Sequence, residues 1–235
     1  MVYLCQVVFM LGLRGDKDTD SSVKKEDAIF QDMVIADYMD SYQNLSYKAL
    51  TAMHWLKTYC STPQHVIHFD DNIVVNMFKL VSYLDVRLQK RANENIVDTN
   101  PAIGSFDCFD YVSTPVIRDD NSKWKVLEEQ YPPTEYPPYC FGAAFIMDVE
   151  VAPLLLEASL RTTTFVWVDD CYLTGVLREV CGIPINSISN MYEWSNDGFI
   201  ENLIAGDKMF LHDPSHNLKT IESMWTALLY REHQI

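Results

Sequence analysis

An acidic turn between two apolar segments constrains this chain more than any other feature. The segment Val66–Phe69 is followed by Asp70-Asp71-Asn72 and then by Ile73–Val75. Apolar residues on both sides predict a buried strand that ends in a turn carrying the three polar side chains. Clustered carboxylates repel one another unless a cation or a donor-rich ligand neutralises them. Such oxygen ligands suit Mg²⁺ or Mn²⁺, so the turn is either a nucleotide–metal site or an ordinary acidic surface turn.

A second acidic pair follows another apolar segment. Asp169 and Asp170 come directly after Phe165–Val168, and the apolar spacing from Leu173 to Val180 predicts a helix that ends at Gly182. A carboxyl group beside an apolar strand, at the start of a helix, is well placed to have the raised pKa of a general base. The alternative role is that of a helix N-cap, which requires no catalysis.

The first half of the chain alternates between strand-like and helix-like segments. We predict strands at Val7–Leu11, Phe30–Ile35 and Val66–Phe69, a loop or helix entry at Gly15–Lys25, and helices at Tyr42–Tyr59 and Val74–Arg87. This alternation is typical of an α/β fold with a mostly parallel sheet flanked by helices. Ligands of such sheets bind at the carboxyl ends of the strands, where Asp70 and its neighbours would lie.

The second half of the chain does not continue the regular alternation of strands and helices. We predict strands at Phe106–Val116 and Trp124–Val126 around a turn at Arg118–Lys123, an extended loop at Tyr131–Tyr139, a strand at Phe145–Met147 and a helix at Ala152–Leu160. The loop is dense in Pro and Tyr, which excludes a regular helix. Its aromatic rings could serve as platforms for sugar faces or could pack over the core. No repeat or linker divides the chain, so residues 1–235 are interpreted as one domain.

The charge balance argues against some classes of binding partner. There are 18 basic and 33 acidic residues among 235, a formal net charge of −15, which argues against nucleic acid and anionic membranes as partners. The apolar start, Met1–Leu13, lacks a basic n-region and is too short to span a bilayer. The six cysteines are compatible with disulfides or with free thiols, and Asn44-Leu45-Ser46 is an N-glycosylation sequon that matters only in a lumenal protein.

Five blocks of sequence occur in a recognisable order. They are Asp37–Lys48, the acidic run Asp70–Asn76, Lys123–Val126, the stretch from Tyr131-Pro132 to Tyr136–Gly142, and Val168–Gly175. From about Val7 to Gly182 the chain resembles the β-1,3-galactosyltransferase and β-1,3-N-acetylglucosaminyltransferase family, glycosyltransferase family 31, which includes the fringe-like enzymes.

The resemblance implies a GT-A fold, in which a nucleotide-binding α/β sheet joins a smaller acceptor-side sheet. It implies an inverting transfer of galactose or N-acetylglucosamine from a UDP-sugar to a hydroxyl of a glycan acceptor on a glycoprotein or glycolipid, usually with Mn²⁺ (or Mg²⁺). Asp170 then matches the catalytic base, and Asp70, Asp71 and Asn72 match the metal and nucleotide motif. Trp124, Tyr139, Gly142 and Asp169 match the acceptor or pocket side, and His212 is a candidate further metal ligand.

The resemblance also implies a Golgi lumenal, type II membrane protein whose N-terminal anchor and early basic block are not in this sequence. Cys60, Cys140, Cys171 and Cys181, which lie in or beside the blocks, would then be the cysteines expected to pair. Asn72 stands where the family usually has a third consecutive acid, which would weaken metal binding. An inactive relative that binds glycans or partner proteins in the Golgi is therefore the alternative. Donor sugar, acceptor and linkage stay open.

Overall fold

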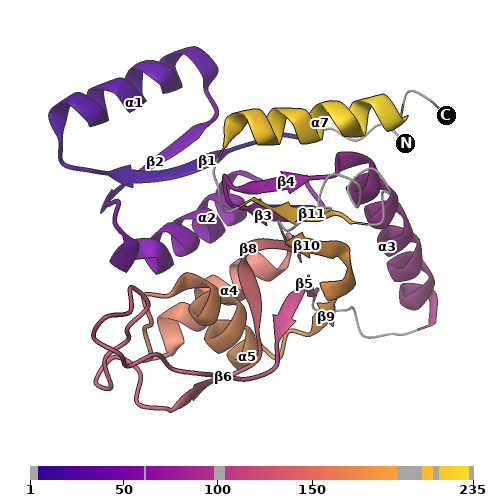
Figure 1. Cartoon of the computed structure of the whole chain (residues 1–235). Helices are drawn as coiled ribbons and strands as arrows, with labels where there is room; N and C mark the ends of the chain where they lie inside the picture. Colours follow the sequence, from indigo (N-terminus) through magenta and orange to yellow (C-terminus); the bar gives the residue numbers. More distant parts are fainter. Residues whose placement is uncertain (1–4, 61, 98–103, 195–207, 214–216, 233–235) are drawn as a thin grey trace.

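The computed structural model describes residues 5–60, 62–97, 104–194, 208–213 and 217–232 (Figure 1). Within these ranges the chain is a mixed α/β structure in which helices pack around small sheets. The largest sheet has four strands in the order β3 (His65–Phe69), β8 (Tyr139–Asp148), β5 (Phe106–Tyr111) and β9 (Ile185–Ser187). Most of β8 is buried, so this strand forms the centre of the core.

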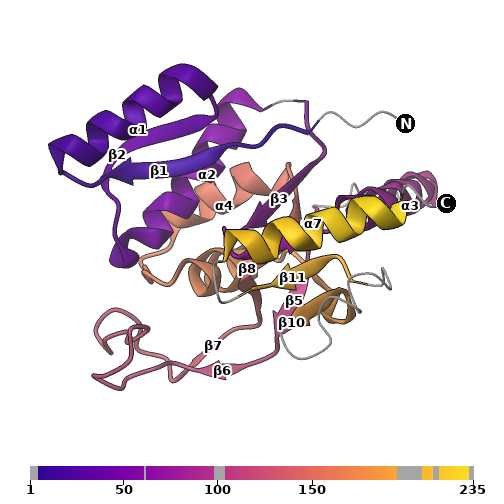
Figure 2. The same ribbon diagram turned by 45° about the horizontal axis from the view of Figure 1, so that its top comes forward.

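An outer unit precedes this sheet in the chain. The strands β1 (Phe9–Leu13) and β2 (Met33–Met39) pair in parallel and are connected by α1 (Lys17–Phe30), none of whose residues is buried. A short 3₁₀ turn, η1 (Tyr42–Asn44), leads into α2 (Leu45–Tyr59). Figures 1 and 2 show this unit, in indigo, set to one side of the sheet that contains β8.

A third sheet joins distant parts of the chain. Its order is β10 (Tyr192–Trp194), β11 (Phe210–His212) and β4 (Ile73–Val75). The 3₁₀ turn η3 (Ser189–Met191) enters β10. Two helices belong to this side of the molecule, α3 (Met77–Val97) and α7 (Leu218–Glu232), the latter lying above β4 and β11 (Figure 1).

The remaining elements are a short hairpin and the helices that follow β8 in the chain. The hairpin of β6 (Thr114–Pro115) and β7 (Glu135–Tyr136) borders the Pro- and Tyr-rich loop. Helix α4 (Val151–Arg161) packs on α2, and the π-helical segment η2 (Cys171–Leu177) continues into α5 (Arg178–Cys181). The loop is held from inside, because the guanidinium of Arg118 donates to the carbonyl oxygens of Val126, Tyr131 and Pro133.

Several predicted elements need correction. The strand predicted at Trp124–Val126 is wrong, because these residues form turns and irregular chain. The helix predicted from Val74 starts only at Met77, because Ile73–Val75 is the buried strand β4. For Gly15–Lys25, predicted as a loop or helix entry, the second alternative is confirmed, because α1 begins at Lys17.

The prediction of a mostly parallel sheet is also wrong. β8 pairs antiparallel with both β3 and β5, and only the β5–β9 pair of this sheet is parallel. The physical reason lies in the connection: β8 follows the Pro- and Tyr-rich loop and the β6–β7 hairpin, not a crossover helix, and only parallel neighbours require a crossover. Strand direction is set by these long-range pairings, which alternation along the chain does not encode.

A buried cluster of charges fixes α3 to the sheet. The Nε of Arg87 lies 2.7 Å from Oδ2 of Asp107, and its Nη1 lies 2.8 Å from Oδ1 of Asp148. Both carboxylates are about 1% exposed, and the Arg87 side chain is 8% exposed. Tyr83 and Ser105 add hydrogen bonds to the same groups. Charges buried in this way are stable only while they are paired.

One disulfide is present among the described residues. Cys108 of β5 is bonded to Cys140 at the start of β8, with their Cα atoms 5.6 Å apart. This corrects the expected pairing: Cys60, Cys171 and Cys181 are free thiols, and the partner of Cys140 comes from outside the blocks of the resemblance. Adjacent strands bring two cysteines within bonding distance whatever their spacing in sequence. In the described part of the chain no helix is long and apolar enough to cross a membrane.

Candidate functional site

The first acidic segment lies where β3 ends. Phe69 is the last residue of β3, and the backbone N–H of Asp70 donates to the carbonyl of Ala143 on β8 at 2.8 Å. The N–H of Ile73 donates back to the carbonyl of Asp70 at 3.1 Å and closes a turn through Asp71 and Asn72. The predicted strand-to-acidic-turn transition is therefore present, with the carboxyl groups at the carboxyl end of a strand.

The second acidic segment lies at the start of η2. The side chain of Asp170 accepts a hydrogen bond from the N–H of Cys171 at 2.7 Å. Asp170 is therefore the N-cap of this segment, which was one of the two roles that the sequence predicted for it. Burial and the neighbouring charge of Asp169 raise the pKa of Asp170 to about 7, although hydrogen bonds from Cys171 and Gly142 oppose the rise. A cap and a general base are compatible here, because the carboxylate is held in place and titrates near neutrality.

Strand β8 brings the two acidic segments together. A Cβ atom at Gly142 would lie 3.0 Å from both Cβ and Oδ2 of Asp170, so this carboxylate rests directly on the strand. Burial raises the pKa of Asp70, and repulsion from Asp169 and from Asp71 contributes to the rise. Burial also raises the pKa of Asp169. The sequence predicted two acidic turns; the fold assembles them into a single acidic site.

Two basic side chains lie beside these carboxylates. The charges of His68 and Lys48 lower the pKa of both Asp70 and Asp169, and Nε2 of His68 lies 3.7 Å from Oδ1 of Asp70. The His68 ring stacks on Phe145 with centroids 4.7 Å apart. Neither His68 nor Lys48 was proposed as a site residue from the sequence. His68 could have been found because it precedes Asp70 by two positions, the spacing that places side chains on one side of an extended chain.

Asn72 and His212 meet through the pairing of β4 with β11. The N–H of Asp213 donates to the carbonyl of Asn72 at 2.8 Å, and Nδ2 of Asn72 lies 3.3 Å from Nε2 of His212. Oδ1 of Asn72 is buried and accepts no hydrogen bond from the described residues. Amide oxygen, carboxylate and imidazole are donors that suit Mn²⁺, so the chemistry of Asp70, Asn72 and His212 fits such an ion. Within the described residues, however, no three His, Cys, Asp or Glu side chains are grouped so that they could hold a metal.

An aromatic wall borders the site, formed by Phe109, Tyr111, Phe141, Trp194 and the ring of His212. Phe141 directly precedes Gly142, and its ring centroid lies 4.9 Å from that of Trp194 and 6.2 Å from that of His212. Phe109 contacts both Phe141 and Trp194. Trp194 is 36% exposed. Of these residues only His212 was predicted as a site residue, as a metal ligand; the wall itself was not predicted, because its rings come from four strands that are not all adjacent in the chain.

Two of the predicted pocket residues have mainly structural contacts. Trp124 stacks on Trp167 at 5.9 Å, and Trp167 lies two positions before Asp169. Trp124 therefore supports the segment that presents the acidic pair. Tyr139 accepts a hydrogen bond from Thr114 at 3.2 Å and packs against Tyr111 at 5.1 Å. Burial raises the pKa of its phenol, with a further contribution from Cys171.

The sequon begins at Asn44, the last residue of η1, and continues into α2. Nδ2 of Asn44 donates to the carbonyl of Met39 at 2.7 Å. The hydroxyl of Ser46 is fully buried and donates to the carbonyl of Val166 at 2.5 Å. The Ser46 hydroxyl, which is part of the sequon, is thus enclosed in the fold. Glycosylation of Asn44 would therefore have to precede folding of this segment.

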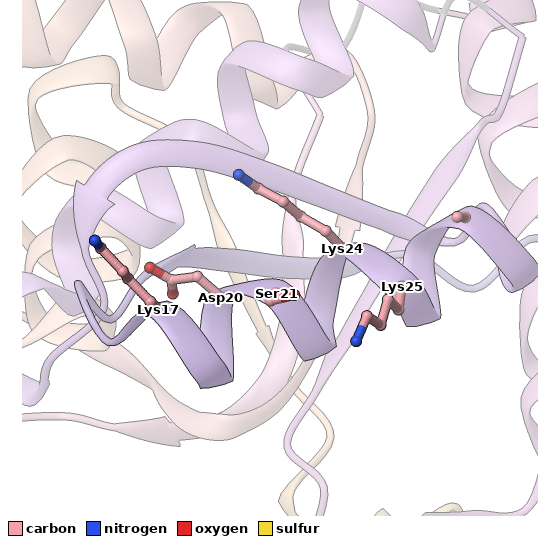
Figure 3. Close-up of a pocket in the computed structure, with 6 residues that line it drawn as sticks. Lys17, Asp20, Ser21, Lys24 and Lys25 are labelled. Carbon is pink, nitrogen blue, oxygen red and sulfur yellow. The ribbon is translucent and has the colours of Figure 1, made fainter.

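A hollow in the described part of the chain lies along a different element. It has a volume of about 520 Å³ and runs along α1, lined by Lys17, Asp20, Ser21, Lys24, Lys25 and Ala28 (Figure 3). It shares no residue with the acidic site, and its lining comes from a helix without buried residues. We assign it no role in the chemistry of the acidic site.

Comparison with known proteins agrees with the order of the blocks. A family model described as galactosyltransferase matches residues 3–189. The chain is 32% identical over 192 residues to "Beta-1,3-galactosyltransferase 1" of Mus musculus and of Homo sapiens, covering 82% of this chain and 52% of each relative. It is 31% identical over 182 residues to "Lactosylceramide 1,3-N-acetyl-beta-D-glucosaminyltransferase" of Xenopus tropicalis, covering 76% of this chain and 45% of that protein. The chain thus spans about half the length of these relatives, and it belongs to the galactosyltransferase family, glycosyltransferase family 31.

Proposed function

We propose that this protein is an inverting β-1,3-hexosyltransferase that transfers galactose or N-acetylglucosamine from a UDP-sugar to a hydroxyl of a glycan acceptor on a glycoprotein or glycolipid. The observation that carries the proposal is the carboxyl group of Asp170, whose pKa is raised to about 7 and which rests on Gly142 beside the acidic turn of β3. Family membership supplies the reaction class, and relatives named for galactosyl and for N-acetylglucosaminyl transfer support both donors.

In the proposed reaction Asp170 is the general base. Its carboxylate takes the proton from the acceptor hydroxyl as the hydroxyl oxygen bonds to the anomeric carbon. The bond from that carbon to the diphosphate breaks on the opposite face, UDP leaves with the electron pair, and the anomeric configuration inverts. Asp169 keeps the pKa of Asp170 high by its charge, so that Asp170 is a strong enough base near neutral pH.

Asp70, Asp71, Asn72 and His212 form the donor side of the proposal. A bound Mn²⁺ or Mg²⁺ would supply positive charge to the leaving diphosphate. Asp70, Asn72 and His212 would hold it, because their oxygen and imidazole donors suit the ion and the amide oxygen of Asn72 is buried without a hydrogen-bond donor. Burial and, to a smaller extent, repulsion from Asp169 and Asp71 raise the pKa of Asp70, and such a cation would relieve the repulsion.

The aromatic wall is proposed as the acceptor side. Rings of Phe141 and Trp194 beside Gly142 offer apolar faces of the kind on which sugar rings stack, next to the proposed base. We also propose a GT-A arrangement and residence in the Golgi lumen. The disulfide between Cys108 and Cys140 supports an oxidising compartment.

The proposal is tested on the purified chain in two steps. Titration calorimetry with UDP, with and without Mn²⁺, measures donor binding, and a radiolabelled transfer assay with UDP-galactose and UDP-N-acetylglucosamine on β-linked acceptor glycans measures turnover. Asp170→Asn should keep UDP binding and lose transfer by at least about a hundredfold, because a positioned base contributes about 10²–10⁴-fold. Asp119→Asn, in an exposed turn, is the matched control and should behave as the wild type. Equal transfer by both variants would remove Asp170 from the mechanism.

A second candidate function is a non-catalytic relative that binds glycans or partner proteins. It is favoured by one observation: Asn72 stands where the resemblance places a third acid, and its amide approaches His212 in place of a carboxylate. Such a protein would bind acceptor glycans with no dependence on Mn²⁺ and no binding of UDP. The calorimetric experiment separates the two, because donor binding that requires the metal is expected only of the enzyme.

A further inference from the structure

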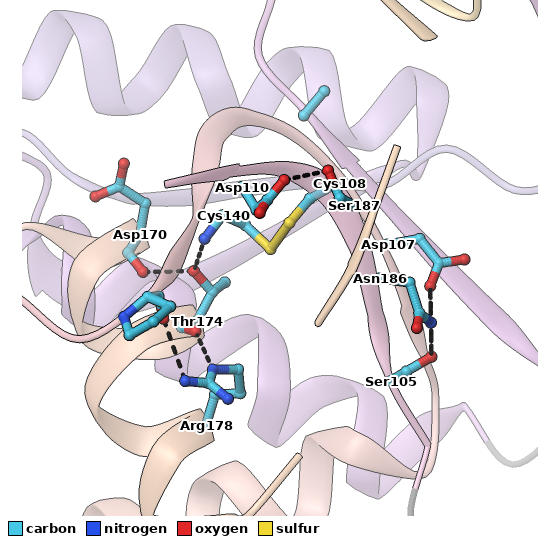
Figure 4. Close-up of a disulfide and its surroundings, with 12 residues drawn as sticks. Ser105, Asp107, Cys108, Asp110, Cys140, Asp170, Thr174, Arg178, Asn186 and Ser187 are labelled. Carbon is cyan, nitrogen blue, oxygen red and sulfur yellow. Dashed lines mark hydrogen bonds between the residues drawn. A yellow bond between two sulfur atoms is a disulfide. The ribbon is translucent and has the colours of Figure 1, made fainter. Parts of the chain in front are cut away.

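The hydroxyl of Thr174 connects two elements of the candidate site. Its side chain is fully buried in η2, four residues after Asp170. Oγ1 accepts a hydrogen bond from the backbone N–H of Cys140 at 2.8 Å and donates to the carbonyl of Asp170 at 2.7 Å (Figure 4). A helical threonine commonly bonds the carbonyl four residues earlier. Here the same oxygen also receives an N–H from a strand.

The strand end that Thr174 contacts is itself held firmly. Cys140 is bonded through its sulfur to Cys108 on the neighbouring strand β5. Arg178, one turn further along, donates to the carbonyl of Thr174 at 2.9 Å and to the carbonyl of Pro138 at 3.2 Å. Figure 4 shows the disulfide, Thr174 and Arg178 in a row along the contact between β8 and η2.

The same contact carries Asp170. Gly142 lies two residues after Cys140 on β8, and the Asp170 carboxylate rests against it. Asp170 is therefore tied to β8 twice, by its carboxylate at Gly142 and by its carbonyl through Thr174 to Cys140. A shift of η2 along β8 would move the carboxylate away from the strand. π-Helical segments of this kind occur often at functional sites and are irregular in their backbone hydrogen bonding, so an added side-chain bond has more to fix.

We propose that Thr174 is a positioning residue, whose hydroxyl holds the peptide of Asp170 against the disulfide-anchored start of β8 and so orients the Asp170 carboxylate for proton removal. This inference rests on the proposed function of Asp170. The hydroxyl touches no substrate in this proposal; it acts through the backbone of Asp170 alone. The consequence is that removal of one buried hydroxyl should affect the chemical step and leave donor binding unchanged.

The test compares Thr174→Val, which keeps the shape and removes the hydroxyl, with Thr174→Ser, which keeps the hydroxyl. Thr174→Val should lower kcat at least tenfold with the KM for the UDP-sugar within twofold of the wild type, and Thr174→Ser should restore most of kcat. Thr51→Val is the matched control, because among the described residues Oγ1 of Thr51 bonds only the carbonyl of Tyr47 in its own helix, α2. Wild-type kcat in folded Thr174→Val would overturn the proposal. If Thr174→Val does not fold, Thr174→Cys, which keeps the volume and a weaker donor, takes its place under the same criterion.

A readout without turnover keeps this inference separate from the proposed function. NMR titration of the Asp170 carboxyl and hydrogen exchange of the Cys140 amide are measured in the same variants. In Thr174→Val the titration midpoint should move and the Cys140 amide should exchange at least tenfold faster, whereas Thr174→Ser should match the wild type in both. Absence of transfer activity in the wild-type protein would contradict the proposed function. An unchanged Asp170 titration midpoint and an unchanged Cys140 exchange rate in Thr174→Val would contradict the positioning role of Thr174.

Discussion

The carboxylate of Asp170 lies against the backbone of Gly142, so close that a Cβ atom at position 142 would sit 3.0 Å from both Cβ and Oδ2 of the aspartate. This contact joins the start of η2 to the middle of β8, and β8 in turn carries the hydrogen bond from Asp70 to Ala143. The acidic segments at Asp70 and Asp170, which are remote in the chain, therefore both contact β8 at neighbouring residues.

Gly142→Ala should displace the Asp170 carboxylate. The new methyl group would meet the aspartate at 3.0 Å, tighter than most real Cβ contacts, so the carboxylate must move by a few tenths of an ångström. We therefore expect kcat to fall about tenfold or more while UDP affinity stays near wild type. Gly175→Ala is the matched control, since its Cβ would crowd Tyr139 at 3.2 Å in the same interface and not Asp170. Equal losses in both variants would attribute the effect to general crowding.

Transfer should depend on a single ionisation near neutrality. A general base acts only when deprotonated, and burial holds the pKa of Asp170 at about 7. The rate should therefore reach a plateau at alkaline pH and fall about tenfold per pH unit on the acidic side. A profile of kcat/KM between pH 5.5 and 9, which reports ionisations of the free enzyme, checks this. A flat profile across pH 7 would exclude Asp170 as a base with this pKa.

Asp170→Asn should stabilise the fold at alkaline pH. The folded protein holds the pKa of Asp170 at about 7, against 3.8 for an unperturbed aspartate, so the folded state binds this proton more tightly than the unfolded state. Wild-type stability is therefore lost as pH rises from about 4 to about 7, and the amide variant escapes that loss. Urea unfolding should give a gain that is larger at pH 8 than at pH 5.5 by up to about 2 kcal/mol. Asp119→Asn should show no such pH-dependent gain.

Asn72→Asp should strengthen the response to Mn²⁺. The new carboxylate would add a negative ligand next to His212, where Asn72 now offers a buried amide oxygen. We expect UDP affinity in the presence of Mn²⁺ to rise by about tenfold, since affinity increases with the charge of the ligand set. Asn76→Asp is the control, because Asn76 caps α3 through its side-chain oxygen and an aspartate can do the same. Calorimetric titration with identical curves for Asn72→Asp and wild type would count against Asn72 as a metal ligand.

Arg87→Met should be severely destabilising. It removes the partner of Asp107 and Asp148, which are both about 1% exposed, and leaves two buried carboxylates without their cation. Breaking a buried pair in this way costs about 3–5 kcal/mol. Arg161→Met, which breaks an exposed pair with Glu157 on α4, should cost less than about 1 kcal/mol. Urea unfolding of both variants measures the difference, and similar losses would show that the buried cluster is not held by Arg87.

Much of the local structure follows from the sequence. The apolar run before Asp70 is a strand that ends at Phe69, and the apolar spacing before Tyr59 and after Ala152 marks α2 and α4. These features depend on neighbouring residues alone, through alternation, helical spacing and breakers. The acidic pairs, the candidate base and the family resemblance are likewise readable along the chain.

Other features depend on strand pairing. The direction of β8, the bond between Cys108 and Cys140, and the approach of Asn72 to His212 each bring together residues that no local pattern connects. The predicted cysteine pairing failed for this reason, and the contacts of His68 and Thr174 were not foreseen.

The sequence by itself determined that Asp70 and Asp170 would each follow an apolar segment. Local side-chain chemistry and backbone preference are sufficient for that. Only the tertiary structure decided that both would be held by β8, that burial and Asp169 would bring the pKa of Asp170 to about 7, and that a glycine at position 142 would leave room for its carboxylate. Burial and electrostatic coupling are properties of distances in space, and those distances exist only once the strands have paired.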